Sequence, residues 1–219
     1  MSFTLACVMV RGHNRRYSPK YILRLREMVS RHTDRPFKMV CLTDEPEIMP
    51  EGVVGVRVPR TRGTERGWWR KMYLFHPNLP FKGRVLYLDL DVLVVNDLNP
   101  ILDFPADFAI APDSAVNFQG KDQWSVVKGY QSSVMVWDHK ARVRFFKEYD
   151  PYVQKRLWGD QDLIKEISPN EATFPAKWFE RVTPSGPEDW TPETKVVLCV
   201  KYKPHKAIKI FPWFADYWR

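Results

Sequence analysis

The sequence has few cysteines and no long apolar run. Its three cysteines, Cys7, Cys41 and Cys199, are odd in number and far apart, which excludes a disulfide framework, and no CxxC pair suggests zinc. No apolar stretch approaches the roughly 20 residues that span a bilayer. The first one, residues 4–10, is too short for a signal-peptide core, and no small-residue cleavage site follows it. We therefore expect a cytoplasmic protein whose mature chain starts at Met1.

Several nucleotide and hydrolase motifs are missing as well. The chain has no Walker A loop, no GxGxxG, no GxSxG and no HExxH, and its five histidines are scattered. P-loop, dinucleotide-binding, α/β-hydrolase and zincin-type sites therefore have no support. Only 10 glycines are present, and a single one, Gly12, lies near the N-terminus, where a nucleotidyltransferase normally has a glycine-rich phosphate loop.

What is present is enough apolar sequence for a folded core. The chain has 219 residues, 44% of them hydrophobic and 14% aromatic, which excludes a disordered protein. No repeat or low-complexity linker divides it, so we expect one domain over residues 1–219. The 34 basic and 26 acidic residues give a net charge of +8. This charge favours an anionic partner, without choosing among a nucleotide, a nucleic acid and a membrane surface.

The order of apolar patterns predicts an α/β fold with a mainly parallel central sheet flanked by helices. A helix over residues 19–32 begins at Ser18-Pro19, an N-cap followed by proline, and repeats apolar residues at helical spacing. The other expected helices cover residues 69–75, 141–149, 160–167 and, at the aromatic tail, 211–219. The expected strands cover residues 4–10, 37–42, 53–58, 84–88, 92–95, 108–111, 133–137 and 195–200.

The strongest local signal is a pair of acids inside an apolar segment, Asp89-Leu90-Asp91, with apolar residues resuming at Val92. Burying a carboxylate there is costly unless it is paired or binds a cation. On an extended chain, residues two apart point to the same face, and ligands bind at the carboxyl ends of parallel strands. Two carboxylates on one face suit Mn²⁺ or Mg²⁺, with a diphosphate completing the shell. The alternative is a pair of solvated turn acids.

Three other clusters have polar or charged side chains that suit an anionic or sugar ligand. Six basic residues lie within residues 57–71 and would hold phosphates or an anionic acceptor, or else form a solvated loop. The segment Gly159-Asp160-Gln161-Asp162 opens a helix, where Asp160 would face a ligand or only cap the helix. Gln131-Ser132-Ser133 would line a sugar pocket or satisfy a turn. Tryptophans such as Trp158 would stack on sugar or base rings, although most of the nine should be core.

In this order along the chain, the motifs resemble those of glycosyltransferases with the GT-A fold, in particular small bacterial and phage proteins related to family 8. The resemblance is based on residues 67–75 (GWWRKMYLF), 85–95 with the DxD, 131–137 (QSSVMVW), 159–162 (GDQD) and 201–204 (KYKP). The resemblance covers most of the chain. It implies transfer of a sugar from a nucleoside-diphosphate sugar, most often UDP-linked, to a hydroxyl acceptor, with Mn²⁺ and retention of the anomeric configuration.

The resemblance also implies roles for individual residues. Asp89 and Asp91 would bind the metal, and Asp89 would also approach the donor ribose. Lys71 would face the donor, and Asp160, Gln161 and Asp162 would lie beside the transferred sugar. These four would be the catalytic residues. The remaining donor contacts that it implies, from the base to the phosphates, are Arg11, Gly12, Tyr17, Thr43, Asp44, Arg70, Leu90, Gln131, Ser132 and Lys203.

Two positions depart from the family pattern. Gln131 stands where the family usually has asparagine before its serine pair, and Leu198-Cys199-Val200 stands where relatives have a metal-binding histidine. Either Cys199 is the third metal ligand, or His205 substitutes for it, or the metal is weakly held. A soft thiolate suits Mn²⁺ poorly.

The acceptor stays open between a glycan precursor and a hydroxymethylated base in DNA. Two other functions also stay open: a non-catalytic nucleotide-sugar binder, because the histidine is lost, and a nucleotidyltransferase, which uses related folds and paired acids. The sequence does not indicate an oligomeric state.

Overall fold

The protein is described by a computed structural model that covers residues 1–11, 17–60, 66–113 and 129–218. The strands are β1 (Phe3–Met9), β2 (Phe37–Thr43), β3 (Val53–Arg57), β4 (Arg84–Leu88), β5 (Val92–Val94), β6 (Phe108–Pro112), β7 (Tyr130–Asp138), β8 (Ala172–Thr173), β9 (Phe179–Arg181) and β10 (Val196–Leu198). The α-helices are α1 (Pro19–Arg31), α2 (Asn99–Leu102), α3 (Val143–Lys147), α4 (Asp160–Ile167), α5 (Pro204–Ile210) and α6 (Phe214–Tyr217). The 3₁₀ helices include η1 (Pro46–Ile48), η2 (Gly67–Phe75) and η4 (Pro151–Lys155).

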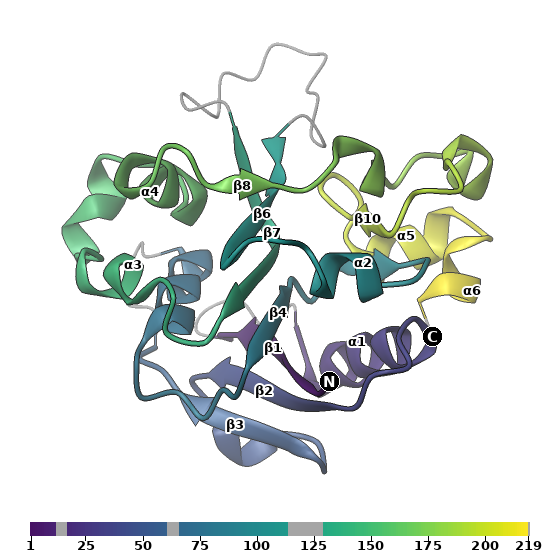
Figure 1. Ribbon diagram of the computed structural model, residues 1–219. Helices are drawn as coiled ribbons and strands as arrows, with labels where there is room; N and C mark the ends of the chain where they lie inside the picture. Colours follow the sequence, from purple (N-terminus) through teal and green to yellow (C-terminus); the bar gives the residue numbers. More distant parts are fainter. Residues whose placement is uncertain (12–16, 61–65, 114–128, 219) are drawn as a thin grey trace.

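A seven-stranded sheet forms the centre of the molecule, in the order β3-β2-β1-β4-β7-β6-β8 (Figure 1). Strands β3, β2, β1 and β4 are parallel, and β7 runs antiparallel to both of its neighbours, β4 and β6. Near-continuous apolar sequence in these strands fits a sheet that is covered on both faces. The expected α/β fold with a mainly parallel sheet is therefore confirmed.

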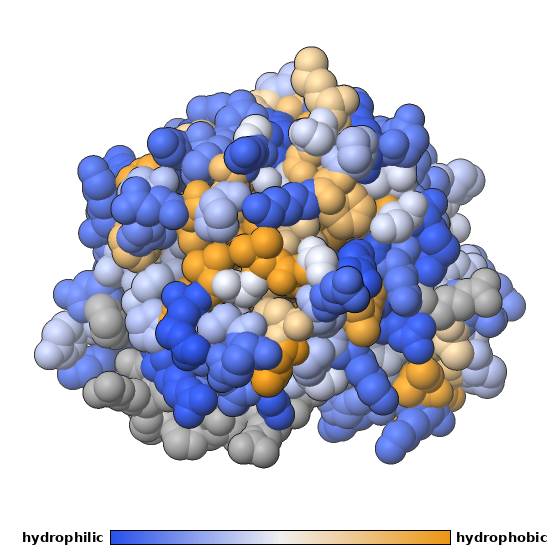
Figure 2. Space-filling model, turned by 90° about the horizontal axis from the view of Figure 1, so that it is seen from below, coloured by the Kyte–Doolittle hydropathy of each residue, from blue (hydrophilic) through white to orange (hydrophobic). Residues whose placement is uncertain are grey.

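The two faces of the sheet bury different side chains, because successive residues of a strand point to opposite faces. On β1, Leu5 and Cys7 pack in the core cluster of α1, whereas Ala6 packs in the cluster of η2, α3 and α4. Figure 1 shows α1 on one side of the sheet and α3 and α4 on the other. From below, where the edge strand β3 lies, the surface is mostly hydrophilic, with hydrophobic residues gathered near its middle (Figure 2).

A second, three-stranded sheet, β5-β10-β9, begins directly after the DxD. Here the apolar run of residues 84–95 divides between two sheets, with Asp89-Leu90-Asp91 as the link between β4 and β5. Residues of both sheets pack in the same core cluster as α1. The two acids therefore lie at the carboxyl end of a central strand, at the junction of the two sheets.

Several elements differ from those expected. The tail forms two short helices, α5 and α6, in place of a helix over 211–219, because Pro212 lacks the N–H that would continue a helix. The segment 69–75 forms the longer 3₁₀ helix η2, and α3 is shorter than the expected 141–149. Strands β8 and β9 are two and three residues long, which is too short to predict from the sequence. None of the helices within the described ranges has the length and apolar character needed to cross a bilayer.

Gly186 gives a stability test of the packing around the tail. Its φ is +62°, and an added Cβ would lie 2.3 Å from Cε2 of Trp213. We expect Gly186→Ala to lower the free energy of unfolding by about 3 kcal/mol, since backbone strain and an overpacked ring add together. Urea unfolding measures this loss.

The matched control is Gly83→Ala. Gly83 has a similar φ of +63°, but its added Cβ would meet only Ser2 O at 3.9 Å. This variant should lose only about 1 kcal/mol, from the backbone conformation alone. Equal losses in both variants would show that the contact with Trp213 is unimportant.

Candidate active site

One cavity lies where the carboxyl end of β4, the start of β7, the start of α4 and the segment after β10 meet. Its volume is about 270 Å³, near the lower end of the roughly 300–1,000 Å³ of small-molecule sites. The lining residues are Trp68, Lys71, Asp89, Asp91, Val92, Gln131, Ser132, Ser133, Trp158, Gly159, Asp160, Gln161, Leu198, Cys199, Val200 and Lys203. Five of them are ionisable acids and lysines, which makes the cavity a charged one.

Asp89 is held by several donors at once. The Tyr87 hydroxyl donates to its Oδ1, and the Ser133 hydroxyl donates to its Oδ2 at 2.7 Å. The Lys71 ammonium group lies 3.0 Å from Oδ1. Burial alone would raise the pKa of Asp89, but the Lys71 charge and the two hydroxyl donors lower it. Asp89 is therefore a fixed, ionised carboxylate in the cavity wall.

Lys71 is the cation at the centre of the cavity. It is buried on η2, its Nζ donates to the Ser132 hydroxyl at 3.1 Å, and it lies 3.9 Å from Oδ2 of Asp160. Burial opposes the charged form, but the carboxylates of Asp160 and Asp89 outweigh it and raise the pKa of Lys71. Lys71 therefore stays protonated near neutral pH and is available to a phosphate.

Asp160 begins α4 and is 1% exposed. Its Oδ2 is buried and has no hydrogen-bond partner in the described part of the chain. Burial raises the pKa of Asp160, although the Lys71 charge opposes that rise. A buried oxygen that lines a cavity without a donor indicates a place for a polar ligand.

Gln161 and Asp162 differ in position although they are neighbours. Gln161 lines the cavity, where the Ser132 hydroxyl lies 3.4 Å from its Oε1. Asp162 instead caps α4, because its Oδ2 accepts a hydrogen bond from the Gly159 N–H at 3.0 Å. Of the three expected catalytic residues in this segment, Asp160 and Gln161 therefore face the cavity and Asp162 supports the helix.

Asp91 also lines the cavity and has two partners. The Tyr17 hydroxyl donates to its Oδ2 at 2.8 Å, and Lys203 Nζ lies 2.5 Å from the same oxygen. Lys203 comes from the start of α5 and Tyr17 from the start of α1, so the carboxylate joins two distant segments. Burial and the Asp91 charge raise the pKa of Tyr17 far above its usual value, which keeps the hydroxyl a donor.

Cys199 also lies in the cavity wall, and its N–H donates to the Asp91 carbonyl at 3.3 Å. Burial, with the charge of Asp91, raises the pKa of this thiol well above its usual value. A protonated thiol is a poor metal ligand. His205 does not line the cavity, and its Nδ1 instead lies 3.2 Å from the Tyr21 hydroxyl.

Carboxylate oxygens of Asp89 and Asp91 are the hard ligands that Mg²⁺ and Mn²⁺ prefer. Three carboxylates and two lysines line the cavity, which gives it a formal charge of −1. This negative charge favours binding of a cation first, and the bound cation would then attract a diphosphate. Among the described residues, no three His, Cys, Asp or Glu side chains come together as metal ligands. Asp89 and Asp91 are the carboxylates that would hold a divalent ion, and each is paired with a lysine in this structure.

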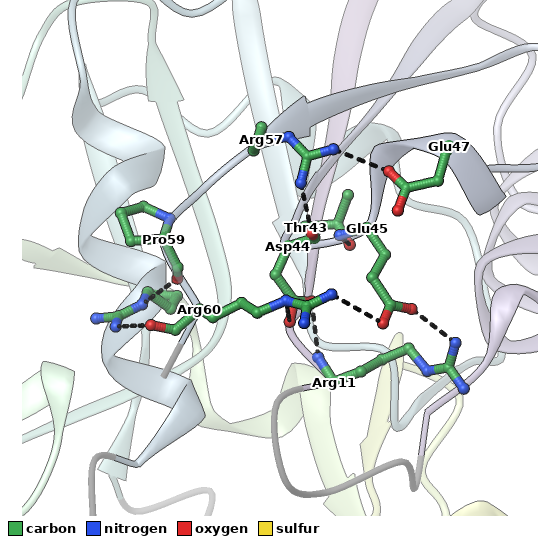
Figure 3. Close-up of polar contacts among 9 residues, drawn as sticks. Arg11, Thr43, Asp44, Glu45, Glu47, Arg57, Pro59 and Arg60 are labelled. Carbon is green, nitrogen blue, oxygen red and sulfur yellow. Dashed lines mark hydrogen bonds and ion pairs between the residues drawn. The ribbon is translucent and has the colours of Figure 1, made fainter. Parts of the chain in front are cut away.

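A second polar cluster lies at the carboxyl end of β2, beside the cavity strands (Figure 3). Asp44 Oδ1 accepts from the Arg11 N–H at 3.0 Å, and Arg60 Nε lies 3.4 Å from Oδ2. The side chains of Arg11 and Arg60 also pair with Glu45. The cluster thus brings together Arg11, Thr43 and Asp44, three of the expected nucleotide contacts.

The sheet register places this cluster at the same level as the DxD. Thr43 pairs with Met9 on β1, and Ala6 of β1 pairs with Tyr87, one residue before the end of β4. The same register, continued by three residues, brings Met9 level with Leu90, just after β4. Two strand spacings separate β2 from β4 by about 10 Å. A ligand that contacts the carboxyl ends of both β2 and β4 would be an elongated molecule.

Other expected residues lie elsewhere. Arg70 does not line the cavity, because it is 4% exposed and donates to the carbonyls of Pro59 and Arg60. Leu90 is part of the core. Gly12 lies outside the described residues. Sequence reasoning did not assign Trp68, Val92, Leu198 or Val200 to the site, although they lie in segments that the resemblance singled out.

Comparisons with known proteins agree with this fold. No family model matches the chain, and no curated protein matches it. Among solved structures, the galactosyltransferase LgtC in complex with donor and acceptor sugar analogs is 14% identical, with a TM-score of 0.69 over 97% of this chain and 94% of LgtC. The apo glycosyltransferase GlyE of Streptococcus pneumoniae TIGR4 is 13% identical, with a TM-score of 0.58 over 93% of this chain and 56% of GlyE.

The apo bifunctional glycosyltransferase WbbM is 12% identical, with a TM-score of 0.59 over 99% of this chain and 49% of WbbM. These similarities show that the chain has the GT-A fold of glycosyltransferases, as the resemblance in sequence motifs implied. At these identities the likeness extends to the fold, and the chemistry must be argued from the cavity.

Proposed function

We propose that the protein is a metal-dependent glycosyltransferase that moves a sugar from a nucleoside-diphosphate sugar, UDP-linked, to a hydroxyl acceptor with retention of configuration. The main support for this proposal is the cavity at the carboxyl end of the central strand β4. Three carboxylates and two lysines line it together: Asp89, Asp91, Asp160, Lys71 and Lys203. The fold shared with glycosyltransferases supports the same class of reaction.

The donor would lie along the carboxyl ends of the strands. Its base and ribose would occupy the side of Arg11, Thr43 and Asp44. Its diphosphate would lie against Asp89, Asp91 and Lys71, which line one cavity. The distance of about 10 Å between β2 and β4 suits an elongated nucleotide. Lys203 lies 2.5 Å from Asp91 and would reach the same phosphates once a cation binds that carboxylate.

Asp89 and Asp91 would hold Mn²⁺ or Mg²⁺ from two fixed positions. When bound, the ion would neutralise negative charge on the departing diphosphate. Lys71 adds a second positive charge from the protein itself, and burial makes its interaction with phosphate oxygens stronger than in water. Gln131, Ser132 and Tyr17 would complete the donor contacts.

Transfer breaks the bond between the anomeric carbon and the diphosphate oxygen, and the electron pair leaves with the diphosphate. The acceptor oxygen forms the new bond to the anomeric carbon, and its proton passes to the leaving diphosphate. Asp160 and Gln161 would stabilise the positive charge on the sugar, since Asp160 Oδ2 lacks a donor. If the product were inverted, Asp160 would act as general base, and the NMR anomeric configuration of the product distinguishes the two outcomes.

Cys199 is expected to contribute little to metal binding. Because its thiol is protonated and buried, Cys199→Ser should change the Mn²⁺ concentration needed for half-maximal activity by less than about twofold. A manganese titration of UDP release measures this. A tenfold increase would instead identify Cys199 as the third ligand.

The test of the function is UDP release from a panel of UDP-sugars with Mn²⁺, in the wild type and in Asp91→Ala. We expect release by the wild type and almost none by the variant. Binding of UDP-sugars with equal background release in both would identify a non-catalytic binder. Release of pyrophosphate from nucleoside triphosphates would identify a nucleotidyltransferase.

A further inference from the structure

Two exposed tryptophans lie on the rim of the cavity. Within the described ranges, six large hydrophobic residues are exposed, and the two tryptophans among them are Trp68 and Trp158, 41% and 39% exposed. Both line the cavity. Exposed apolar rings beside a charged cavity indicate a surface that contacts a ligand.

The pair is fixed in place although it is exposed. The Trp68 Nε1–H donates to the Trp158 carbonyl at 3.3 Å, and the ring centroids are 6.2 Å apart. Arg66 donates to the same carbonyl at 3.1 Å, and its guanidinium lies 3.6 Å from the Trp158 ring centroid. A surface held this way loses little conformational freedom when a ligand binds.

The two tryptophans lie close in sequence to Lys71 and Asp160, two of the proposed catalytic residues. Trp68 lies on η2 three residues before Lys71, and Trp158 lies two residues before Asp160, which begins α4. A molecule that contacts both tryptophans is therefore next to the place of the transferred sugar. This is where an acceptor, rather than the nucleotide, would lie.

The shape and charge of the rim favour a sugar over a nucleic acid. The ring planes meet at 43°, so the pair does not form a parallel slot for a flat base. A DNA acceptor would also need basic residues along its phosphates. Arg57 and Arg60 are instead paired with Glu47 and Asp44, and Arg70 bonds to backbone carbonyls. The rim residue Arg66 is held against the Trp158 ring and its carbonyl.

We propose that Trp68 and Trp158 form the acceptor site and that the acceptor is a pyranoside, whose C–H face stacks on these rings. A pyranose has an apolar face of C–H groups, which matches the exposed faces of aromatic rings. The inference rests on the proposed function, because it assigns the acceptor of that same reaction.

The test measures transfer from UDP-glucose and UDP-galactose, with Mn²⁺, to the methyl pyranosides of glucose, galactose, mannose and N-acetylglucosamine. A DNA duplex with 5-hydroxymethylcytosine is the competing acceptor. We expect transfer to a pyranoside and not to the duplex. Trp68→Ala and Trp158→Ala should each raise the KM for that pyranoside at least about tenfold, while the KM for the donor changes less than about twofold.

The control variant is Tyr152→Ala, which removes an aromatic ring that is 71% exposed and does not line the cavity. It should leave both KM values unchanged. Trp158→Phe keeps a flat ring and should recover most of the affinity for the pyranoside, which a merely structural role in folding would not predict.

Two results would overturn the inference while leaving the proposed function intact. These are UDP release with transfer only to the DNA duplex or to none of the pyranosides, and pyranoside KM values that are unchanged in both alanine variants. If the wild type neither binds nor cleaves any nucleotide sugar, the proposed function itself fails. The two failures are therefore distinguishable.

Discussion

Replacing Lys71 with methionine is expected to lower both the stability and the activity of the protein. Methionine fills a similar volume but removes the charge that lies 3.0 Å from Asp89 and 3.9 Å from Asp160. Removing one partner of a buried ion pair typically costs about 3–5 kcal/mol. Loss of a buried donor to the leaving diphosphate should lower the rate of donor cleavage by about 100- to 1,000-fold. Urea unfolding and steady-state UDP release measure the two effects.

A double variant separates the two effects. In Lys71→Met with Asp160→Asn, the second change removes the carboxylate that lost its partner, so part of the stability should return. The activity should not return, because the phosphates still lack their cation and the transferred sugar also loses the Asp160 carboxylate. If the double variant regained activity together with stability, Lys71 would be a structural residue and its proposed role in leaving-group stabilisation would be wrong.

Asp91→Asn, unlike Lys71→Met, should lower the activity strongly and the stability only a little. The amide keeps the shape of the carboxylate but lacks the charge that binds the cation and pairs with Lys203. Lys203 has a side chain that is 36% exposed, so water can solvate it when its partner is neutral. We expect UDP release at a fixed Mn²⁺ concentration to fall at least about 100-fold, and thermal unfolding to move little.

The matched control for this variant is Asp216→Asn, an acid exposed on α6 that does not line the cavity. It changes the net charge by the same amount and should keep full activity. An equal loss in both variants would mean that overall charge, and not the DxD site, governs the reaction.

The sequence predicts the central part of the site because burial makes polar residues conspicuous there. Two acids within an apolar run indicated the carboxyl end of a central strand, and the structure has Asp89 and Asp91 at the end of β4. The sequence also predicts Asp160 and Gln161 at a helix start beside a glycine, and both residues line the cavity.

The remainder could not be predicted, because it depends on contacts between segments far apart in the sequence. Whether a tryptophan is core or rim is not visible in its neighbours, so the exposure of Trp68 had no signal. Arg70 belongs to a basic cluster in sequence, yet it is buried and bonds to backbone carbonyls. Likewise, nothing in the apolar run of residues 84–95 indicates that it divides between two sheets.

The account depends on a nucleotide-sugar donor held by a divalent ion at Asp89 and Asp91. The most direct measurement is a crystal structure of the protein with a UDP-sugar and Mn²⁺, with anomalous differences recorded at the manganese edge. We expect one manganese peak bonded to both carboxylates, with the diphosphate facing Lys71 and the uridine beside Asp44. A donor bound outside the cavity, or manganese remote from both carboxylates, would contradict the account.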